Sequence, residues 1–212
     1  AIRIIAVTKT YPALVIGEAL AAGLTDVGEN YVQEARAKRA TVPPGATWHL
    51  IGGLQRNKVR AAVALFDVVH TVDSAPLAAA LGAAAGGRRL PVLIQVNVGG
   101  EGTKRGVPPE GVEGLARAVL KERGLALEGF MAVPPAASSE QGRLYFRQLR
   151  EARDLVATRL GVELPHLSMG MSSDFTVAVE EGATWLRLGR ALFGARGPAG
   201  GRPGSRAGGE AS

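Results

Sequence analysis

Residues 2–23 read IRIIAVTKTYPALVIGEALAAG, an apolar run followed directly by a helical pattern. The run holds five apolar side chains around one arginine between residues 2 and 7, and it ends at Lys9. The pattern after it opens with Pro12 and closes at Gly23, residue types that favour the start and the end of a helix. The segment therefore predicts one strand–helix unit of an α/β fold, with a lysine where the strand ends.

The same alternation recurs along the whole chain. After a first strand at residues 2–9, apolar runs predict strands at residues 26–29, 48–52, 68–72, 91–98, 127–133, 166–169 and 185–188. Helical patterns separate these runs. Eight strands separated by seven helices predict an α/β protein built as a single (β/α)8 TIM barrel. A doubly wound open sheet is the alternative, but no Gly-x-Gly-x-x-Gly turn follows the first strand.

Two helical segments carry specific expectations. Residues 142–161 predict a helix with one buried face, formed by Leu144, Leu149, Ala152 and either Leu155 or Val156. The eighth helix of the barrel is expected either in a segment before the first strand, because the chain begins without Met, or in the short stretch ALFGAR at residues 191–196.

The composition is that of one soluble globular domain. The 212 residues are 46% hydrophobic and 21% charged, and they suffice for one sizeable core. We expect a barrel domain over residues 1–196 and a disordered tail, rich in Gly, Pro and Arg, over residues 197–212. No apolar run reaches the roughly 18 residues of a membrane span. Because no signal peptide precedes the first strand, a cytoplasmic protein is expected.

The ionisable residues give weaker signals. The net charge of +6 invites a nucleic-acid function, but the basic residues are spread along the chain and often stand beside acids, as in REARD at residues 150–154. We therefore expect no nucleic-acid surface. The chain has no cysteine, so it has neither a disulfide nor a thiolate metal site. His49, His70 and His166 are scattered in the sequence, and a structural or solvent-facing role is expected for each.

The chemistry of a TIM barrel lies at the C-terminal ends of its strands. Lys9 follows the first strand, and Arg187 lies in the eighth. These two strands are neighbours when the barrel closes, so we expect the two side chains to lie together. A solvated lysine is the alternative for Lys9. However, a lysine amine beside a cation has a lowered pKa, which favours the neutral form that attacks a carbonyl.

The loops after the seventh and eighth strands are the usual phosphate site of such barrels. Here they contain Ser168, Gly170, Ser172 and Ser173 in the first loop and Gly189 in the second. Each loop taken singly is an ordinary Gly/Ser turn, but together they favour a bound phosphate. An imine-forming lysine, a phosphate cradle and one placed arginine indicate a phosphorylated aldehyde cofactor, pyridoxal 5′-phosphate (PLP).

Seven segments together resemble one known family, the YggS/PROSC-like PLP-binding proteins, also called pyridoxal phosphate homeostasis proteins. The segments are VTKT, GENYVQE, WHLIGGLQRNK, TVDS, VNVGGEGTKRG, SMGMSSDF and RLGRALFG. The resemblance implies a single barrel similar to the N-terminal domain of bacterial alanine racemase. It further implies that Lys9 carries PLP as an internal aldimine (a Schiff base) and that Asn30 borders the cofactor. In the same way, Ser168, Met169 and Ser172 would hold the phosphate with Gly189, and Arg187 would face the pyridine nitrogen.

The resemblance also implies a function. A guanidinium keeps its proton, so a PLP ring facing Arg187 would be a weak electron sink. Racemases of this fold add a second base from another domain, which this chain is expected to lack. The implied role is therefore PLP binding for intracellular PLP (vitamin B6) homeostasis without robust catalysis, with PLP-dependent apo-enzymes as candidate partners. Because a second domain is expected to be absent, we expect a monomer, and without an apolar span we expect no membrane binding. A low-activity PLP-dependent amino-acid racemase is the alternative.

The sequence departs from the family pattern in two places. Arg190 follows Gly189 where the family usually has Thr or Ser, and the given sequence starts at the first strand, without the helix that the family pattern leads us to expect before it. Lys104 matches a family lysine in the loop after the fifth strand. A secondary contact to PLP and a solvated loop lysine are both open for Lys104.

Overall fold

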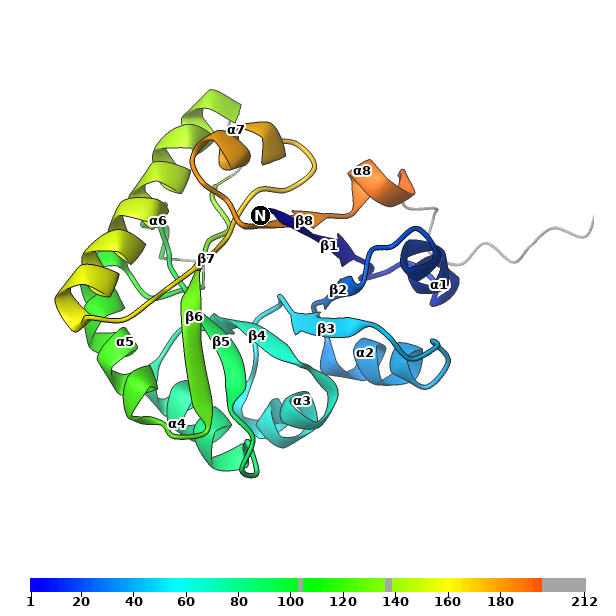
Figure 1. Cartoon of the computed structure of the whole chain (residues 1–212), viewed down its shortest axis with the longest axis horizontal. Coiled ribbons are helices and arrows are strands. Elements are labelled where there is room, and N and C mark those ends of the chain that lie inside the picture. Colours follow the sequence, from blue (N-terminus) through cyan, green and yellow to red (C-terminus); the bar gives the residue numbers. More distant parts are fainter. Residues whose placement is uncertain (103–104, 136–138, 196–212) are drawn as a thin grey trace, which may run out of the picture.

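The computed structural model describes residues 1–102, 105–135 and 139–195, so Lys104 and the predicted tail lie outside the described residues. Within this part of the chain, eight parallel strands form a closed barrel in sequence order, with helices around it (Figure 1). The strands are β1 (Arg3–Val7), β2 (Asp26–Glu29), β3 (Thr47–Leu50), β4 (Val68–Val72), β5 (Leu90–Gln95), β6 (Leu125–Met131), β7 (His166–Ser168) and β8 (Trp185–Leu188). The predicted (β/α)8 TIM barrel is confirmed.

The helices alternate with the strands. They are α1 (Leu14–Ala21), α2 (Val32–Arg39), α3 (Val59–Leu65), α4 (Ala75–Ala84), α5 (Val112–Lys121), α6 (Ser139–Leu160), α7 (Phe175–Glu180) and α8 (Arg190–Phe193). Short 3-10 turns precede α3 at Arg56–Lys58 and α5 at Pro109–Gly111. The eighth helix therefore lies after β8, in the second of the two places that the sequence allowed.

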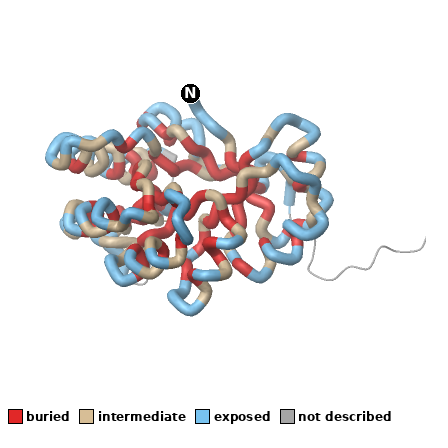
Figure 2. The backbone as a smooth tube through the Cα atoms, turned by 60° about the horizontal axis from the view of Figure 1, so that its bottom comes forward, coloured by how far each residue is buried: buried red, intermediate tan, exposed pale blue. Residues whose placement is uncertain are grey.

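The barrel closes between β1 and β8, where Ile5 lies beside Arg187. This pairing brings the two ends of the described chain together and sets the position of the candidate site. The strands are buried on both faces, which is why they read as nearly continuous apolar runs. Figure 2 shows this buried centre beneath an exposed outer layer. A separate cluster of buried apolar residues is formed by Ile5, Val68, Leu93, Met131 and Trp185, which come from five of the strands.

Five predicted strands extended too far at their C-terminal ends. The first ends at Val7 rather than residue 9, the third at Leu50 rather than 52, the fifth at Gln95 rather than 98, the sixth at Met131 rather than 133, and the seventh at Ser168 rather than 169. The physical reason is clearest after β1, where Thr10 adopts a left-handed backbone (φ 66°) and the chain turns towards α1. The surplus residues form loops at the C-terminal mouth of the barrel, where a site is expected.

The buried face of α6 also differs from the prediction. Leu149 is buried as expected, and of the two alternatives Val156 is buried while Leu155 is exposed, but Leu144 is 61% exposed. Phe146 occupies the core instead. A 22-residue helix carries more apolar residues than its single contact face can cover, so the sequence offered more than one plausible stripe.

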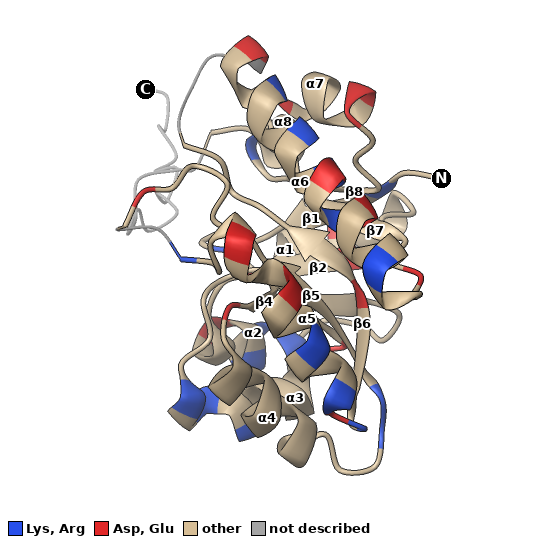
Figure 3. Ribbon diagram, turned by 90° about the vertical axis from the view of Figure 1, so that its left-hand side faces the viewer, with Lys and Arg blue, Asp and Glu red and all other residues tan. Residues whose placement is uncertain are grey.

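The charged residues lie mostly on the outer helices. Figure 3 shows acidic and basic positions interspersed on one face of the molecule. Glu181, which follows α7, forms ion pairs with three arginines of α6. The distances from its carboxylate oxygens to guanidinium nitrogens of Arg143, Arg147 and Arg150 are 3.4, 3.2 and 3.1 Å. No helix among the described residues combines the length and the apolar character that crossing a membrane requires.

Candidate functional site

A cavity of about 290 Å³ opens at the C-terminal ends of the strands. Its lining consists of Val7, Lys9, Asn30, Ile51, Val133, Met171, Ser172, Arg187, Gly189 and Arg190. The cavity thus brings together five of the seven residues predicted for the cofactor. The other two, Ser168 and Met169, are fully buried and do not line it. Met171 lines the cavity and was not singled out from the sequence.

Side chains from β2 and α2 hold the backbone on both sides of Lys9. The Thr8 hydroxyl donates a hydrogen bond to Glu29 Oε1 (2.7 Å), and Lys38 Nζ donates to the Thr8 carbonyl oxygen (2.7 Å). On the other side, the Thr10 N–H donates to Glu34 Oε1 (2.6 Å). Lys9 therefore extends from a fixed segment of backbone.

Lys38 forms ion pairs with both acids of this cluster, Glu29 and Glu34. Its Nζ lies 2.7 Å from Glu29 Oε1 and 2.7 Å from Glu34 Oε1. Burial raises the pKa of Glu29, although hydrogen bonds from Lys38 and Thr8 act in the opposite direction. The second oxygen of Glu29 is buried and has no hydrogen-bond partner among the described residues. The sequence analysis missed this cluster. The signal was present in GENYVQE, which carries both acids, and in the spacing of Glu34 and Lys38 by four residues on one helix.

Arg187 lies under the same cavity and is almost completely buried. Its Nη1 donates to the carbonyl oxygen and to the hydroxyl of Ser168 (2.6 and 2.8 Å), and its Nη2 donates to the Ala132 carbonyl oxygen (2.8 Å). Burial lowers the pKa of the guanidinium to about 10, while the carboxylate of Asp174 acts in the opposite direction. Arg187 is therefore a fixed cation at neutral pH.

The loops after β7 and β8 meet at one end of the cavity. The Ala191 N–H, in the first turn of α8, donates to the Ser172 hydroxyl (3.1 Å). Gly170 has a positive φ of 89°, and a Cβ there would lie 2.6 Å from the Ala178 methyl group. Gly170 is thus required for the loop to pass this close to α7. The arrangement leaves Ser172, Gly189 and the cation Arg190 together on the cavity wall.

The side chains of Ser168 and Met169 take other positions. Ser168 is the last residue of β7, and its hydroxyl lies inside the barrel, bonded to Arg187 and to His70 Nδ1 (3.0 Å). Met169 packs in the apolar layer between the strands and the helices. Successive residues along a strand point to opposite faces, which explains why the two side chains point apart.

The three histidines, scattered in the sequence, converge in the barrel around Trp185. His166 stacks on the indole (ring centroids 4.1 Å apart), and His49 and His70 approach it at 5.3 and 5.0 Å. His49 and His70 are buried, which agrees with the structural role expected for them. Their grouping was not foreseen. The available signal was the presence of one histidine inside each of two apolar strands, β3 and β4.

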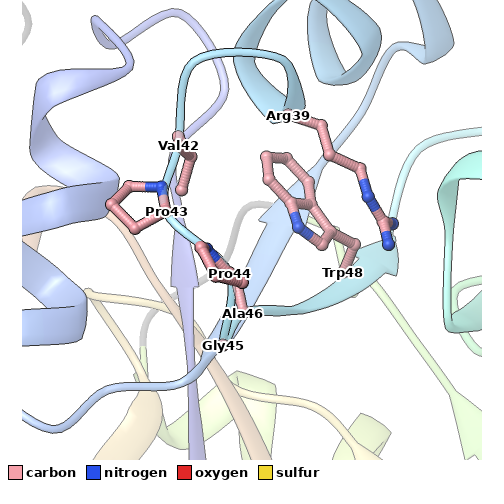
Figure 4. Close-up of a pocket in the computed structure, with 7 residues that line it drawn as sticks. All are labelled: Arg39, Val42, Pro43, Pro44, Gly45, Ala46 and Trp48. Carbon is pink, nitrogen blue, oxygen red and sulfur yellow. The ribbon is translucent and has the colours of Figure 1, made fainter.

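A second hollow, of about 330 Å³, lies where the chain passes from α2 into β3 (Figure 4). Arg39 extends beside the Trp48 ring there, 5.8 Å from the ring centroid, and two prolines form part of the wall. Its lining has no acid, no hydroxyl and no lysine. The cavity at Lys9 is therefore the candidate site. The described residues contain no group of three or more side chains suited to hold a metal ion.

Comparison with known proteins places this geometry in a family. The model of the alanine racemase N-terminal domain matches residues 1–197. The chain belongs to this family. Among its relatives are the pyridoxal phosphate homeostasis proteins of Pseudomonas aeruginosa and Escherichia coli, which are 46% and 40% identical to it. Both alignments cover 92% of this chain, and 85% and 86% of the relatives.

Solved structures agree with this assignment. The protein PipY of Synechococcus elongatus, solved with PLP bound, is 40% identical and superposes with a TM-score of 0.84 over 91% of this chain and 92% of PipY. The alanine racemase of Corynebacterium glutamicum, at 19% identity and a TM-score of 0.73, shares the fold. The family resemblance predicted from the seven sequence segments is confirmed.

Proposed function

We propose that this protein binds PLP in the cavity at the C-terminal mouth of the barrel and serves intracellular PLP (vitamin B6) homeostasis. One observation carries the proposal. Lys9 and the buried cation Arg187 line one cavity, in a chain that is 40% identical to a protein solved with PLP bound. The relatives named pyridoxal phosphate homeostasis protein support the same role.

The residues of the cavity fit this cofactor. PLP supplies an aldehyde that can bond to a lysine amine and a ring that withdraws electrons. We assign Lys9 as the covalent attachment point, because its amine is the nucleophile of the lining. Ser172, Gly189 and Arg190 offer a hydroxyl, a close backbone approach and a positive charge for the phosphate. The volume lies near the lower end of the roughly 300–1,000 Å³ usual for ligand pockets, which suits one small cofactor.

The remaining predicted residues take supporting roles in this proposal. Asn30 borders the ring from the end of β2. Ser168 acts through its hydrogen bonds to Arg187, since its hydroxyl is turned into the barrel. For Met169 the proposal keeps only a backbone contribution to the loop after β7, because its side chain packs in the core.

Arg187 favours binding over turnover. Its guanidinium keeps its proton at neutral pH, so it offers a hydrogen bond to the ring and does not act as an acid. Stabilising a carbanion would require a group that does act as an acid towards the ring. We therefore propose a PLP carrier without robust catalysis, cytoplasmic and monomeric, with PLP-dependent apo-enzymes as recipients. A weak amino-acid racemase is the second candidate, because the fold is shared with alanine racemase.

Covalent attachment can be tested spectroscopically. We expect the purified protein, incubated with PLP and then reduced with borohydride, to carry one PLP-sized adduct on a peptide that contains Lys9. The Lys9→Ala variant should lose both the visible absorbance band and the adduct, whereas Lys58→Ala, a change outside the cavity lining, should keep them. An unchanged spectrum in Lys9→Ala would contradict the proposal.

Formation of D-amino acids distinguishes a racemase from a carrier. The PLP-loaded protein is incubated with L-amino acids, and the D-enantiomer is measured against free PLP at the same concentration. A carrier gives no excess over free PLP. Turnover above that level, lost in Lys9→Ala, would favour the racemase.

A further inference from the structure

A chain of five buried polar side chains crosses the interior of the barrel. Asp26 Oδ1 lies 2.9 Å from His49 Nε2, and His49 Nδ1 lies 2.9 Å from His70 Nε2. His70 Nδ1 lies 3.0 Å from the Ser168 hydroxyl, which accepts a hydrogen bond from Arg187 Nη1 at 2.8 Å. All five residues are at most 8% exposed, and they come from β2, β3, β4, β7 and β8.

The two ends of this row of hydrogen-bonded side chains border different hollows. Arg187 lines the cavity that contains Lys9. Asp26 does not; it lines a separate hollow with Arg3, Thr25 and Thr47, which lie at the N-terminal ends of β1, β2 and β3. The row of polar side chains therefore connects the candidate site with the opposite mouth of the barrel.

The direction of each hydrogen bond follows from the chemistry of the two ends. Arg187 has only N–H donors, so the Ser168 oxygen must accept from it. The hydrogen bond from His49 is the main cause that lowers the pKa of Asp26, so this carboxylate is ionised at neutral pH and can only accept. His49 must therefore donate through Nε2–H.

In the middle of this row, one arrangement of protons gives every ring nitrogen and the Ser168 hydroxyl a hydrogen-bond partner. Burial lowers the pKa of His70 well below 6.5, with the charge of Arg187 acting in the same direction, so His70 is neutral. If His70 donates through Nε2–H to His49 Nδ1, its own Nδ1 accepts the Ser168 O–H. The reverse direction would need a cationic His49 and would leave the Ser168 proton without a partner. Buried polar groups that remain unpaired are costly, which favours the first arrangement.

We propose that Asp26, His49, His70 and Ser168 are positioning residues for Arg187. Each donor in the chain is fixed by the next acceptor, so the Asp26 carboxylate at one mouth of the barrel sets the orientation of the Ser168 hydroxyl at the other. That hydroxyl and the two carbonyl oxygens of Ser168 and Ala132 then hold the guanidinium in place beneath the cavity. The inference rests on the proposed function only where PLP is used as a probe.

The hydrogen-bond directions can be measured without any ligand. In protein labelled with 15N in its histidines, NMR spectra at neutral pH report which ring nitrogen carries the proton. We expect His49 and His70 both as neutral Nε2–H tautomers, with protons that exchange slowly with water. An imidazolium, or an Nδ1–H tautomer, at either position would overturn the assignment.

The coupling to the cavity is tested at the distant end of the chain. In Asp26→Asn the side chain keeps its shape but loses its charge and can donate as well as accept, so the hydrogen-bond direction is no longer fixed from this end. We expect the Kd for PLP to rise about tenfold, the size of one lost charge-assisted hydrogen bond, and the absorbance band of bound PLP to shift. The matched control is Glu128→Gln, since Glu128 Oε2 lies 3.9 Å from His166 Nε2 but is not part of the chain. It should bind PLP as the unmodified protein does.

A second variant separates positioning from a general loss of structure. Ser168→Ala breaks the link next to Arg187 and should produce the same change in Kd and spectrum. If the two residues act through one chain, the double variant should be no worse than either single one, whereas independent structural damage would add. Wild-type Kd and spectrum in a folded Asp26→Asn protein, or additive effects, would overturn the proposal. If the unmodified protein fails to bind PLP, the proposed function is wrong. The NMR measurement of the His49 and His70 tautomers still tests the hydrogen-bond directions in that case.

Discussion

At the scale of single residues, Lys38 supports the segment that carries Lys9. It contacts a backbone oxygen and two carboxylates, and its side chain is only 8% exposed. Because Glu29 is fully buried, its charge is tolerated only through such partners. Lys38 therefore affects both the stability of the fold and the position of the candidate nucleophile.

We predict that Lys38→Met destabilises the protein by about 3–5 kcal/mol, the usual cost of leaving a buried charge without its partner. Urea unfolding followed by circular dichroism measures the loss. Lys121→Met, at an exposed position in the last turn of α5, is the control and should change stability little. Equal effects of the two substitutions would show that the Glu29 environment does not need Lys38.

Sequence reasoning reached Lys9 and Arg187 because both follow from the order of the strands. Any chain that forms this barrel places the first and the eighth strand side by side. The hydrogen bonds around them depend on strand register and on which face a side chain takes. His70 and Ser168, 98 residues apart in the chain, are an example. Such contacts leave no periodic signal, so they could not be predicted from the sequence.

At the scale of elements, the contact between α6 and the end of α7 relies on Glu181. Three arginines of α6 surround this carboxylate. The hydrogen bond from Arg147 is the main cause that lowers the pKa of Glu181 below 4.5, although burial acts in the opposite direction. A carboxylate with a lowered pKa stabilises the folded state above its unfolded pKa, and this contribution is lost as the pH falls through the folded pKa.

We therefore predict that Glu181→Gln reduces the free energy of unfolding at neutral pH and flattens its decline below about pH 4.5. Chemical unfolding at a series of pH values measures both effects. Glu163→Gln serves as the control, since this exposed acid forms no ion pair among the described residues. The hypothesis fails if the two variants lose stability in parallel as the pH is lowered.

The elements themselves were predicted better than their contact faces. All eight strands were found because each is an apolar run, but several ends were misplaced where the runs continue into loops. In α6, the apolar periodicity fitted more than one stripe, and tertiary packing selected Phe146 over Leu144. Periodicity thus reports that a helix has a buried side without deciding which side it is.

At the scale of the whole molecule, a ligand held by residues of β1 and β8 should stabilise the closed barrel. We predict that PLP at 100 times its Kd raises the free energy of unfolding by about 2.7 kcal/mol. Thermal unfolding at increasing PLP concentration measures this as a rising Tm. Lys9→Ala should show a much smaller rise, and equal shifts in both proteins would mean that PLP binds elsewhere.

The closure between β1 and β8 also has a consequence for synthesis of the protein. Lys9 leaves the ribosome well before Arg187, so the two halves of the cavity are made on the order of ten seconds or more apart. A nascent or truncated chain has the reactive amine without its buried cation. Capture of the ligand would therefore require that β8 has been made, and only chains with a closed barrel would gain the stability that it provides.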